Sequence, residues 1–363
     1  MKILNTLIDL ESPTYFIADI AANHDGDLER ALHLIELAAN AGADCVKFQH
    51  HTAERVASDK GYRQLGDKLG HQAKWKKSVY QVYKEAEVSK SWTPILAEHA
   101  ASCGVHFMST PYSFEMVDHI DPYVPAYKIG SGDVNWHMLL EKICSKQKPV
   151  ILSTGASTLE EVQKSYNVLL SNGIQKEDIC IMQCNTNYTG QEKNYDFINL
   201  NVLRTFRNSF PDSILGLSDH THGHVTTLGS VAFGAKIVEK HFTDDNDRIG
   251  PDHSFSMNPI TWRQMVDDTR ILERSFGSEI KVVEDNEKQT VVVQRRSVRC
   301  LKDIDINDII ELEHFDFQRP CPSDACDLNE FYEFMKHNKV ACPFSIKVGD
   351  HVTKEMLEKL KDE

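Results

Sequence analysis

The chain has 363 residues, of which 41% are hydrophobic and 26% are charged, as in an ordinary globular protein. Its 40 Lys and Arg residues against 54 Asp and Glu residues give a formal net charge of −14, without any basic stripe, which argues against nucleic acids and anionic membranes as partners. No run reaches the roughly 18 apolar residues of a membrane span, residues 1–12 lack a signal-peptide pattern, and the nine cysteines show no CxxC spacing, so we expect a cytoplasmic protein.

Eight short apolar runs, separated by amphipathic stretches, occupy the chain from about residue 15 to about residue 275. They are rich in Val and Ile and lack clean period-two alternation, as expected of parallel strands that are buried on both faces. Eight alternating strand and helix units predict an α/β fold of the (β/α)8 or TIM-barrel type. The predicted strands are Tyr15–Ile20, Cys45–Gln49, Val105–Ser109, Ala126–Gly130, Pro149–Ser153, Ile179–Cys184, Ile214–Ser218 and Lys236–His241.

The stretches between these runs have the pattern of helices. Residues 28–41 carry apolar side chains at the spacing of one helical face. A second helix is expected after Ser157 or Thr158, either of which can cap it, with Glu161 in a first turn where the helix dipole favours acids. Further helices are expected within 223–234 and over 261–276.

Residues 50–92 form an unusually long connection between the second and third predicted strands, and they are rich in charged and aromatic residues. Connections of this length are usually functional. We therefore expect the insertion to cover the barrel mouth, the alternative being a surface excursion that never meets substrate.

The pattern changes near residue 285, where short β-like segments separated by Asp and Asn turns begin. We therefore predict a barrel domain over 1–284, followed by a linker and a small β-rich domain over 285–363. The expected strands are 291–293, 297–301, 309–310, 315–318 and 346–353, and a helix is expected over 328–336.

Two histidines follow neighbouring predicted strands, His220 after Ile214–Ser218 and His241 at the end of Lys236–His241. Because a single helix fits between these strands, both imidazoles should lie at the carboxyl ends that form the active-site face of a barrel. Two imidazoles on one rim suit a divalent metal of borderline softness that keeps open coordination positions. The alternative is two unrelated histidines in loops.

Two lysines occupy similar positions, Lys47 near the end of the second predicted strand and Lys128 within the fourth. A lysine buried in a parallel strand is costly unless it meets an anion. The pair therefore predicts a phosphate or carboxylate site, or else two lysines neutralised by barrel carboxylates such as Asp19 and Asp133.

Small hydroxyl side chains follow several predicted strands, and they are Thr110, Ser131, Ser153 and Ser218. Hydroxyls and backbone amides at strand ends bind phosphate oxygens, although Ser is also an ordinary turn residue. After the eighth strand, Asp252 lies in the turn 250–253, where it could orient a metal-bound water or a substrate hydroxyl or simply form a turn.

Together these motifs resemble those of the sialic acid synthase family, which includes N-acetylneuraminate, legionaminic acid and pseudaminic acid synthases. The resemblance runs in order along nearly the whole chain. The matching stretches are FIADIAANHDGDLERAL, AGADCVKFQ, STPYSFEMVD, VPAYKIGSGD, KPVILSTGASTLEEV, LGLSDHT, GAKIVEKHFT and GPDHSFSM. The later stretches RRSVRCLKDI and QRP resemble the family's small antifreeze-like (SAF) domain.

The resemblance implies a metal-dependent condensation of phosphoenolpyruvate with an open-chain N-acetylated amino sugar, in which phosphate is released by C–O cleavage. It makes His220 and His241 the metal ligands, with Mn²⁺ as the expected ion and Mg²⁺ or Co²⁺ as alternatives. It assigns Asp133, Asp19 and Asp252 to catalysis. It assigns to substrate binding Lys47, Gln49, Thr110, Lys128, Ser131, Ser153, Thr186, Tyr188, Ser218 and Arg319. Arg319 would reach the acceptor sugar of the neighbouring subunit in a domain-swapped homodimer.

The chain departs from the family pattern where the acceptor sugar is expected. Asp19 and Asp133 stand where the family usually has Glu, which shortens each carboxylate arm by one methylene. The usual proline after Tyr188 is replaced by Thr189, and Cys321-Pro322-Ser323 replaces the usual Gly-rich turn.

These departures leave two alternatives open. One is a related phosphoenolpyruvate-condensing barrel synthase that acts on a different sugar aldehyde. The other is an inactive relative that binds anions, against which the intact histidine and lysine pairs argue.

Overall fold

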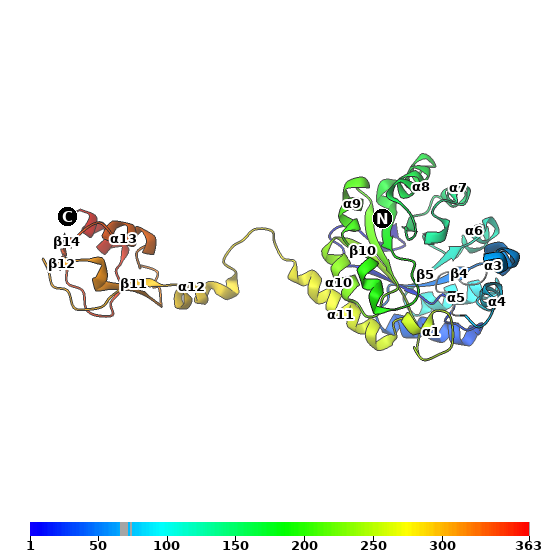
Figure 1. Cartoon of the computed structure of the whole chain (residues 1–363), viewed down its shortest axis with the longest axis horizontal. Helices are drawn as coiled ribbons and strands as arrows, with labels where there is room; N and C mark the ends of the chain where they lie inside the picture. The colour runs from blue at the N-terminus through cyan, green and yellow to red at the C-terminus, as the bar shows by residue number, and fades with distance from the viewer. Residues whose placement is uncertain (66–71, 73–74, 363) are drawn as a thin grey trace. The chain divides into compact units, whose positions relative to one another are not determined.

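The computed structural model describes residues 1–65, 72 and 75–362 and divides the chain into two compact units, Met1–Phe276 and Gly277–Glu363 (Figure 1). The sequence placed the border at residue 285. The intervening residues 277–284 contain no helix or strand, so the change of pattern on which the prediction relied comes after the first unit has already ended.

The first unit is built around one sheet of eight strands in the order β5-β4-β3-β10-β9-β8-β7-β6, in which all neighbours are parallel. The two outer strands in this order, β5 and β6, contact each other, so the sheet closes into a near-barrel. The predicted (β/α)8 fold is thereby confirmed. The strands are β3 (Tyr15–Asp19), β4 (Cys45–His50), β5 (His106–Pro111), β6 (Tyr127–Ile129), β7 (Val150–Ser153), β8 (Ile179–Cys184), β9 (Ile214–Asp219) and β10 (Ala235–His241).

Four of the principal helices of this unit, α1, α6, α8 and α11, begin at residues whose side chains cap them. Asp27 accepts a hydrogen bond from the Arg30 amide at the start of α1, and Thr158 forms a reciprocal capping box with Glu161 at the start of α8. The principal helices are α1 (Leu28–Asn40), α5 (Trp92–Ser102), α6 (Phe114–Ile120), α7 (His137–Cys144), α8 (Leu159–Ser171), α9 (Val202–Ser209), α10 (Val225–Ala232) and α11 (Pro259–Ser275).

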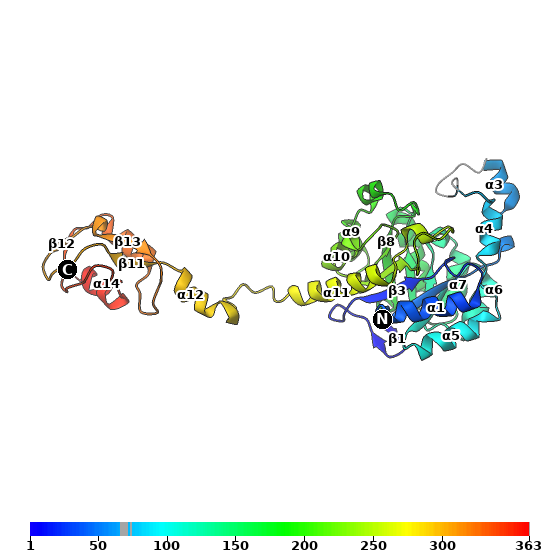
Figure 2. The same cartoon turned by 90° about the horizontal axis from the view of Figure 1, so that it is seen from below.

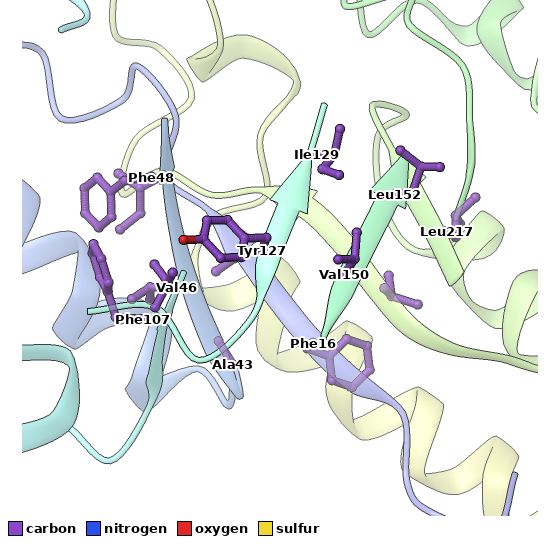
Figure 3. Close-up of a cluster of buried hydrophobic side chains, with 14 of the residues drawn as sticks. Phe16, Ala43, Val46, Phe48, Phe107, Tyr127, Ile129, Val150, Leu152 and Leu217 are labelled. Carbon is purple, nitrogen blue, oxygen red and sulfur yellow. The ribbon is translucent and has the colours of Figure 1, made fainter. Parts of the chain in front are cut away.

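The barrel unit has two apolar cores. The larger lies between the sheet and its helices, and Figure 3 shows part of it, including Phe16, Val46 and Tyr127. The smaller lies inside the barrel, where Tyr15 and Met108 cluster with Met1, Ile3 and Ile8. These last three residues belong to or flank the hairpin of β1 (Lys2–Ile3) and β2 (Thr6–Leu7), which the sequence did not predict. The hairpin residues therefore fill the amino-terminal end of the barrel.

The described residues of the long insertion include the short helices α2 (Ala53–Val56), α3 (Asp59–Leu65) and α4 (Val79–Glu85). Helix α4 packs against both α2 and α3, and Figure 2 shows α3 and α4 projecting from the barrel. Residues 66–71 and 73–74 of the predicted insertion lie outside the described residues.

The second unit is organised by two small antiparallel ladders. Strand β11 (Ser297–Cys300) pairs with β13 (Phe315–Gln318), and β12 (Ile309–Ile310) pairs with β14 (Val340–Ala341). Three helices complete the unit, α12 (Lys288–Gln294), α13 (Leu328–Met335) and α14 (Lys354–Lys361). Val298, Phe331 and Leu357, from a strand and two helices, share its buried core.

Two predictions for this unit were wrong. Residues 291–293 lie in α12 instead of a strand, because this isolated Val run has no neighbouring strand to pair with and follows a turn capped by Glu284. Residues 346–353 make only isolated bridges, at Ile346, His351 and Thr353.

In the part of the chain that the structure describes, no helix has both the length and the apolar character needed to cross a membrane. All nine cysteines are free thiols.

Candidate active site

One pocket at the carboxyl ends of the barrel strands gathers most of the residues that the sequence singled out. We call this pocket the inner pocket. Four of the residues that line it were not predicted as site residues, and they are Tyr112, Gly130, Cys184 and Glu239. The predicted residues that line it are Asp19, Lys47, Gln49, Thr110, Lys128, Ser131, Ser153, Tyr188, Ser218, His220 and His241. Because the strands end at this face, residues distant in sequence converge there.

Lys47, from β4, is held by a carboxylate on the neighbouring strand. Its Nζ donates a hydrogen bond to Asp19 Oδ2 at 2.8 Å, and the Gln49 amide nitrogen donates to the same oxygen at 3.1 Å. Lys47 Nζ is also 3.5 Å from Thr110 Oγ1. Lys47 and Asp19 are both about 2% exposed, so the charge of the lysine is aimed into the pocket without being hydrated.

Lys128, from β6, has a different partner from the one that the sequence suggested. Its Nζ donates to Ser153 Oγ at 2.6 Å and lies 3.4 Å from Glu239 Oε1. The lysines are paired with barrel carboxylates, as the alternative interpretation expected, but Glu239 takes the place suggested for Asp133. Asp133 lies beyond the end of β6, whereas Glu239 projects from β10 into the barrel.

Glu239 is the main site residue that sequence analysis missed. Its Oε1 lies 3.8 Å from Lys47 Nζ and accepts a hydrogen bond from Ser218 Oγ at 3.3 Å, while its buried Oε2 has no hydrogen-bond partner in the part of the chain that the structure describes. Side chains alternate along a strand, so a residue two positions before His241 shares its face. That spacing within Glu239-Lys240-His241 was the available signal.

The two lysines respond oppositely to this environment. Burial acts to lower the pKa of Lys47, but the adjacent carboxylates of Asp19 and Glu239 outweigh it and raise the pKa above its usual value. For Lys128, burial dominates and lowers the pKa, and the charge of Lys47 adds to the decrease. An incoming anion would therefore gain most from Lys128, whose charge is less fully compensated.

His220 and His241 lie side by side, with ring centroids 5.3 Å apart. His220 Nδ1 lies 2.8 Å from the Asn185 carbonyl oxygen, so it carries the proton and leaves the Nε2 lone pair available. The buried Nδ1 of His241 has no hydrogen-bond partner among the described residues, and Asp252 Oδ2 is 3.7 Å away. Burial lowers the pKa of both imidazoles and keeps them neutral.

These features fit a divalent metal. Neutral imidazoles are the form that binds a metal, and the contact to Asn185 fixes the orientation of one ring. Within residues 1–65, 72 and 75–362, no group of three or more His, Cys, Asp or Glu side chains has a metal-holding arrangement. The two histidines would therefore hold an ion as a pair, with other coordination positions left for water or substrate.

An outer pocket adjoins the inner one and shares Gln49, Tyr112, Tyr188 and His241 with it. The rest of its wall combines barrel loops with the insertion, in Ala21, Ala22, His51, Trp75, Val82, Tyr83, Ala86, Pro251 and Asp252. The insertion thus covers part of the mouth, as the sequence predicted.

His51 connects the insertion to the barrel rim. Its Nε2 is 2.9 Å from the Tyr83 carbonyl oxygen, and its ring meets those of Tyr83 and Tyr112 edge-on, with centroids 5.5 and 5.9 Å away. The wall of the outer pocket is consequently aromatic and only partly polar.

Asp252 and Asp133 are carboxyl groups with raised pKa values. Burial, reinforced by the charge of Asp19, raises the pKa of Asp252 to about 7, although the Ala22 amide donates a 3.4 Å hydrogen bond to it. Burial raises the pKa of Asp133 to about 6. Asp133 is not among the residues that line either pocket. Burial raises the pKa of the Tyr112 phenol, and the charge of Asp133 adds to that increase.

Two further predicted residues lie apart from the pocket walls. Thr186 is half-buried, and its Cγ2 would be 2.5 Å from a Cβ placed on Gly155, so it packs against the loop after β7. Arg319 is exposed in the second unit, directly after β13. Tyr188, in contrast, packs against the two neighbouring histidines, with its ring centroid 4.0 Å from that of His220 and 6.0 Å from that of His241.

Comparison with known proteins shows which family the chain resembles. The model of the NeuB family matches residues 34–281. N,N'-diacetyllegionaminic acid synthase of Campylobacter jejuni is 33% identical over 311 residues, which are 85% of this chain and 90% of that protein. N-acetylneuraminate-9-phosphate synthase of Homo sapiens is 31% identical over 276 residues, 75% of this chain and 73% of that protein.

A solved structure shows the same likeness. It is the crystal structure of N-acetylneuraminic acid (sialic acid) synthetase from Leptospira borgpetersenii serovar Hardjo-bovis in complex with citrate. The superposition has a TM-score of 0.70 with 26% sequence identity, and it covers 80% of this chain and 94% of that one.

Proposed function

The chain belongs to the NeuB family, and on this premise we propose that it condenses phosphoenolpyruvate with the open-chain form of an N-acetylated amino sugar. The product would be a nonulosonic, sialic-type acid, and inorganic phosphate would be released by C–O cleavage. The family resemblance expected from the sequence motifs is confirmed by the relatives at 31–33% identity.

The observation that carries this proposal is the composition of the inner pocket. Lys47 and Lys128 supply two buried cationic groups, hydroxyls surround them, and His220 and His241 stand at the adjacent rim. A site that places an anion beside a pair of neutral imidazoles suits one anionic substrate and one carbonyl substrate. These are the two partners of the proposed condensation.

The donor end of the pocket would bind phosphoenolpyruvate. Lys128 and Lys47 would face its phosphate and carboxylate, and hydroxyls from the strand ends would donate to the remaining oxygens; those hydroxyls belong to Thr110, Ser131, Ser153 and Ser218. Because the charged side chains of the site are buried, such charge pairing is stronger than it would be at a surface.

The acceptor end would bind the sugar in the outer pocket, between Tyr83 and Tyr188, with Gln49 at the boundary of the two pockets. His220 and His241 would hold a divalent ion there, with Mn²⁺ the ion that we favour over Mg²⁺ or Co²⁺. Such an ion, when bound, acts as a Lewis acid toward the aldehyde oxygen.

The chemistry balances with the groups present. Carbon 3 of phosphoenolpyruvate attacks the aldehyde carbon, a C–C bond forms, and the aldehyde oxygen takes up a proton. Water then adds at carbon 2 and gives up a proton. The bond from carbon 2 to the phosphate oxygen breaks as the new hydroxyl at carbon 2 becomes a carbonyl, and the proton of that hydroxyl leaves with the phosphate. We assign the two proton transfers to Asp252, which is largely protonated up to about pH 7, and Asp133, which is largely ionised above about pH 6. Asp19 would act by positioning Lys47, with which it makes a 2.8 Å contact.

The test is phosphate release from phosphoenolpyruvate in the presence of Mn²⁺ across a panel of amino-sugar aldehydes that differ in acetylation and in phosphorylation. Release that depends on one sugar and stops with a chelator would support the proposal and identify the acceptor. Absence of release with every sugar, from protein that demonstrably binds Mn²⁺ and phosphoenolpyruvate, would contradict it and favour an anion-binding relative without catalysis.

We also propose that the protein acts as a homodimer in the cytoplasm. The second unit would be an antifreeze-like domain that brings Arg319 to the acceptor pocket of the neighbouring subunit. The free thiol state of all nine cysteines supports a reducing compartment. Light scattering at micromolar concentration tests the dimer. In a monomer, Arg319 could not contact the acceptor pocket of a neighbouring subunit.

A further inference from the structure

Asp219 and Lys240 form a buried ion pair immediately beside the two histidines in sequence. Asp219 is the last residue of β9 and precedes His220, whereas Lys240 precedes His241 in β10. The two residues are register partners across the parallel ladder, and their side chains are 0% and 1% exposed. Neither residue is part of the inner or outer pocket wall.

The pair lies at the centre of a network that ties four segments together. Lys240 Nζ donates to Asp219 Oδ2 and, at 2.8 Å, to the Thr221 carbonyl oxygen. Asp219 Oδ2 also accepts hydrogen bonds from the hydroxyls of Thr221 at 2.8 Å and Thr226 at 2.7 Å. The network therefore joins β9, the turn that follows it, the first turn of α10, and β10.

Because side chains alternate along a strand, this network lies on the opposite face of the strands from the histidines. His241 points into the pocket, so Lys240, one position earlier, points to the opposite face. The Thr221 carbonyl that Lys240 holds belongs to the residue directly after His220. The backbone on both sides of the imidazole pair is thus fixed to the same ammonium group.

We infer that the Asp219–Lys240 pair is a positioning device, which sets the separation of His220 and His241 and so the affinity of this site for a divalent cation. The inference rests on the proposed metal-dependent function. It assigns to the pair no contact with metal or substrate. Outer residues that orient metal ligands typically change metal affinity 10–100-fold when they are removed.

A role in stability alone does not account for the pair. Replacing a buried ion pair by neutral side chains of similar volume is often neutral or stabilising, whereas removing one partner leaves an uncompensated charge. What an ion pair adds over an apolar contact is direction, because its hydrogen bonds fix both strand ends at defined distances.

The experiment compares the wild type with the double variant Asp219→Asn/Lys240→Met, which keeps side-chain volume and leaves no unpaired charge. Mn²⁺ binding to the full-length, metal-free protein is measured from the EPR signal of free Mn²⁺, and thermal unfolding is followed without metal. We expect Mn²⁺ to bind at least tenfold more weakly to the double variant, with a melting temperature within a few degrees of the wild type.

The matched control is Asp121→Asn/Lys148→Met. This pair has an Oδ1–Nζ distance of 2.9 Å and precedes strands β6 and β7, at the opposite end of the barrel from the pocket. Its double variant changes the same charges, and it is expected to bind Mn²⁺ like the wild type.

The outcomes separate the two ideas. Unchanged Mn²⁺ affinity in the Asp219→Asn/Lys240→Met variant, with tight binding by the wild type, would overturn the positioning role and leave the proposed function intact. Failure of the wild type to bind Mn²⁺, Mg²⁺ or Co²⁺ would instead overturn the metal site, and this inference with it. If the double variant does not fold, Thr226→Val replaces it, because this variant removes one of the hydroxyls that donate a hydrogen bond to Asp219. A smaller but measurable loss of Mn²⁺ affinity is then expected.

Discussion

At the scale of single residues, the charged side chains that are costly to bury in the pocket are the same ones that carry the proposed function. Lys47, Lys128, Asp19 and Glu239 are charged side chains with at most 5% exposure. Ionised groups in such surroundings persist only when they are paired. Here the pairing is arranged so that each lysine still faces the pocket, where an anion can add to the charges already present.

Replacing Lys128 by Met is expected to lower kcat/KM for phosphoenolpyruvate at least 100-fold. The variant loses the cation that faces the donor, and truncating one partner of a buried charge pair typically costs about 2–5 kcal/mol. Steady-state phosphate release measures the effect, and the KM for the sugar should change little. Lys148→Met, at a lysine outside the pocket, is the matched control. If the variant instead changes only the KM for the sugar, Lys128 contacts the sugar and not phosphoenolpyruvate.

Asp133→Asn is expected to make the protein more stable and less active. Burial raises the folded-state pKa of Asp133 to about 6, whereas an unfolded chain releases this proton near pH 3.9. The folded protein therefore binds more protons between those values, and its free energy of unfolding falls as pH rises through that window. Asn mimics the neutral carboxyl, so the variant should be more stable than the wild type by roughly 2 kcal/mol at pH 8 and equal to it near pH 3.5.

The same variant should lose 10²–10⁴-fold in kcat if Asp133 accepts a proton during the reaction. In the wild type, activity should then rise with pH through about 6, and Asp133→Asn should remove that limb of the profile. Activity within about tenfold of the wild type would exclude Asp133 from proton transfer. Asp267→Asn, at a half-exposed position on α11, controls for the loss of one carboxylate.

At the scale of secondary-structure elements, the insertion is attached to the barrel through buried histidines. His50 connects Ser109 of β5 to Thr93 of α5 with contacts of 2.6 and 2.8 Å, and Thr93 in turn meets His119. His24 packs against Trp92, and its Nε2 is buried without a hydrogen-bond partner. Burial lowers the pKa of His24 to about 4 and that of His50 to about 3.

These histidines should make the protein sensitive to acid. The unfolded chain takes up their protons near pH 6.5, but the folded chain does not until pH 3–4, so each histidine lowers the free energy of unfolding as the pH falls below 6.5. Between pH 7 and pH 5 each should contribute roughly 2 kcal/mol of loss. Carboxyls such as Asp133 change the stability in the opposite direction. The effect of one histidine is therefore measured by comparing a variant that lacks it with the wild type.

The difference is taken between His24→Gln and the wild type in denaturant unfolding at pH 7 and pH 5. The variant should lose less stability than the wild type on acidification. His33→Gln, at a half-exposed position on α1, should behave like the wild type. An equal loss in all three proteins would show that His24 is not held neutral.

The elements that sequence predicted correctly are those with local causes. The barrel strands follow from Val- and Ile-rich runs, and the start of α8 follows from the capping pattern of Thr158 and Glu161. The pocket residues were predictable because parallel strands deliver their carboxyl ends to one face. In contrast, Glu239 escaped notice because an acid between apolar residues and Lys240 looks like part of a charged pair until its face is known.

The failures were in segments whose structure depends on partners. The Val run at 291–293 has strand-forming residues but no strand to pair with, so it is helical. The hairpin at the chain start consists of two two-residue strands, too short to give a periodic signal. Whether Asp133 reaches the substrate depends on how the loop after β6 folds, which the motif itself does not specify.

At the scale of the whole molecule, the two units have separate cores, one shared by the barrel sheet and its helices and one confined to residues after 277. A chain that ends at residue 284 should therefore fold, with a melting transition within a few degrees of that of the barrel in the intact protein. It should retain Mn²⁺ binding and lose turnover of the acceptor sugar, since Arg319 would be absent. Full activity of the truncated chain would remove the second unit from catalysis.

Because the hairpin residues fill the amino-terminal end of the barrel, we expect the substrates of the proposed reaction to enter from the carboxyl ends of the strands, through the outer pocket. If the inner pocket is the donor site and the outer pocket the acceptor site, phosphoenolpyruvate should bind before the sugar, and a sugar that binds first should block its entry. Initial-rate kinetics should show this as inhibition by excess sugar that is competitive with phosphoenolpyruvate. Random entry would mean that the pathway to the lysines bypasses the sugar.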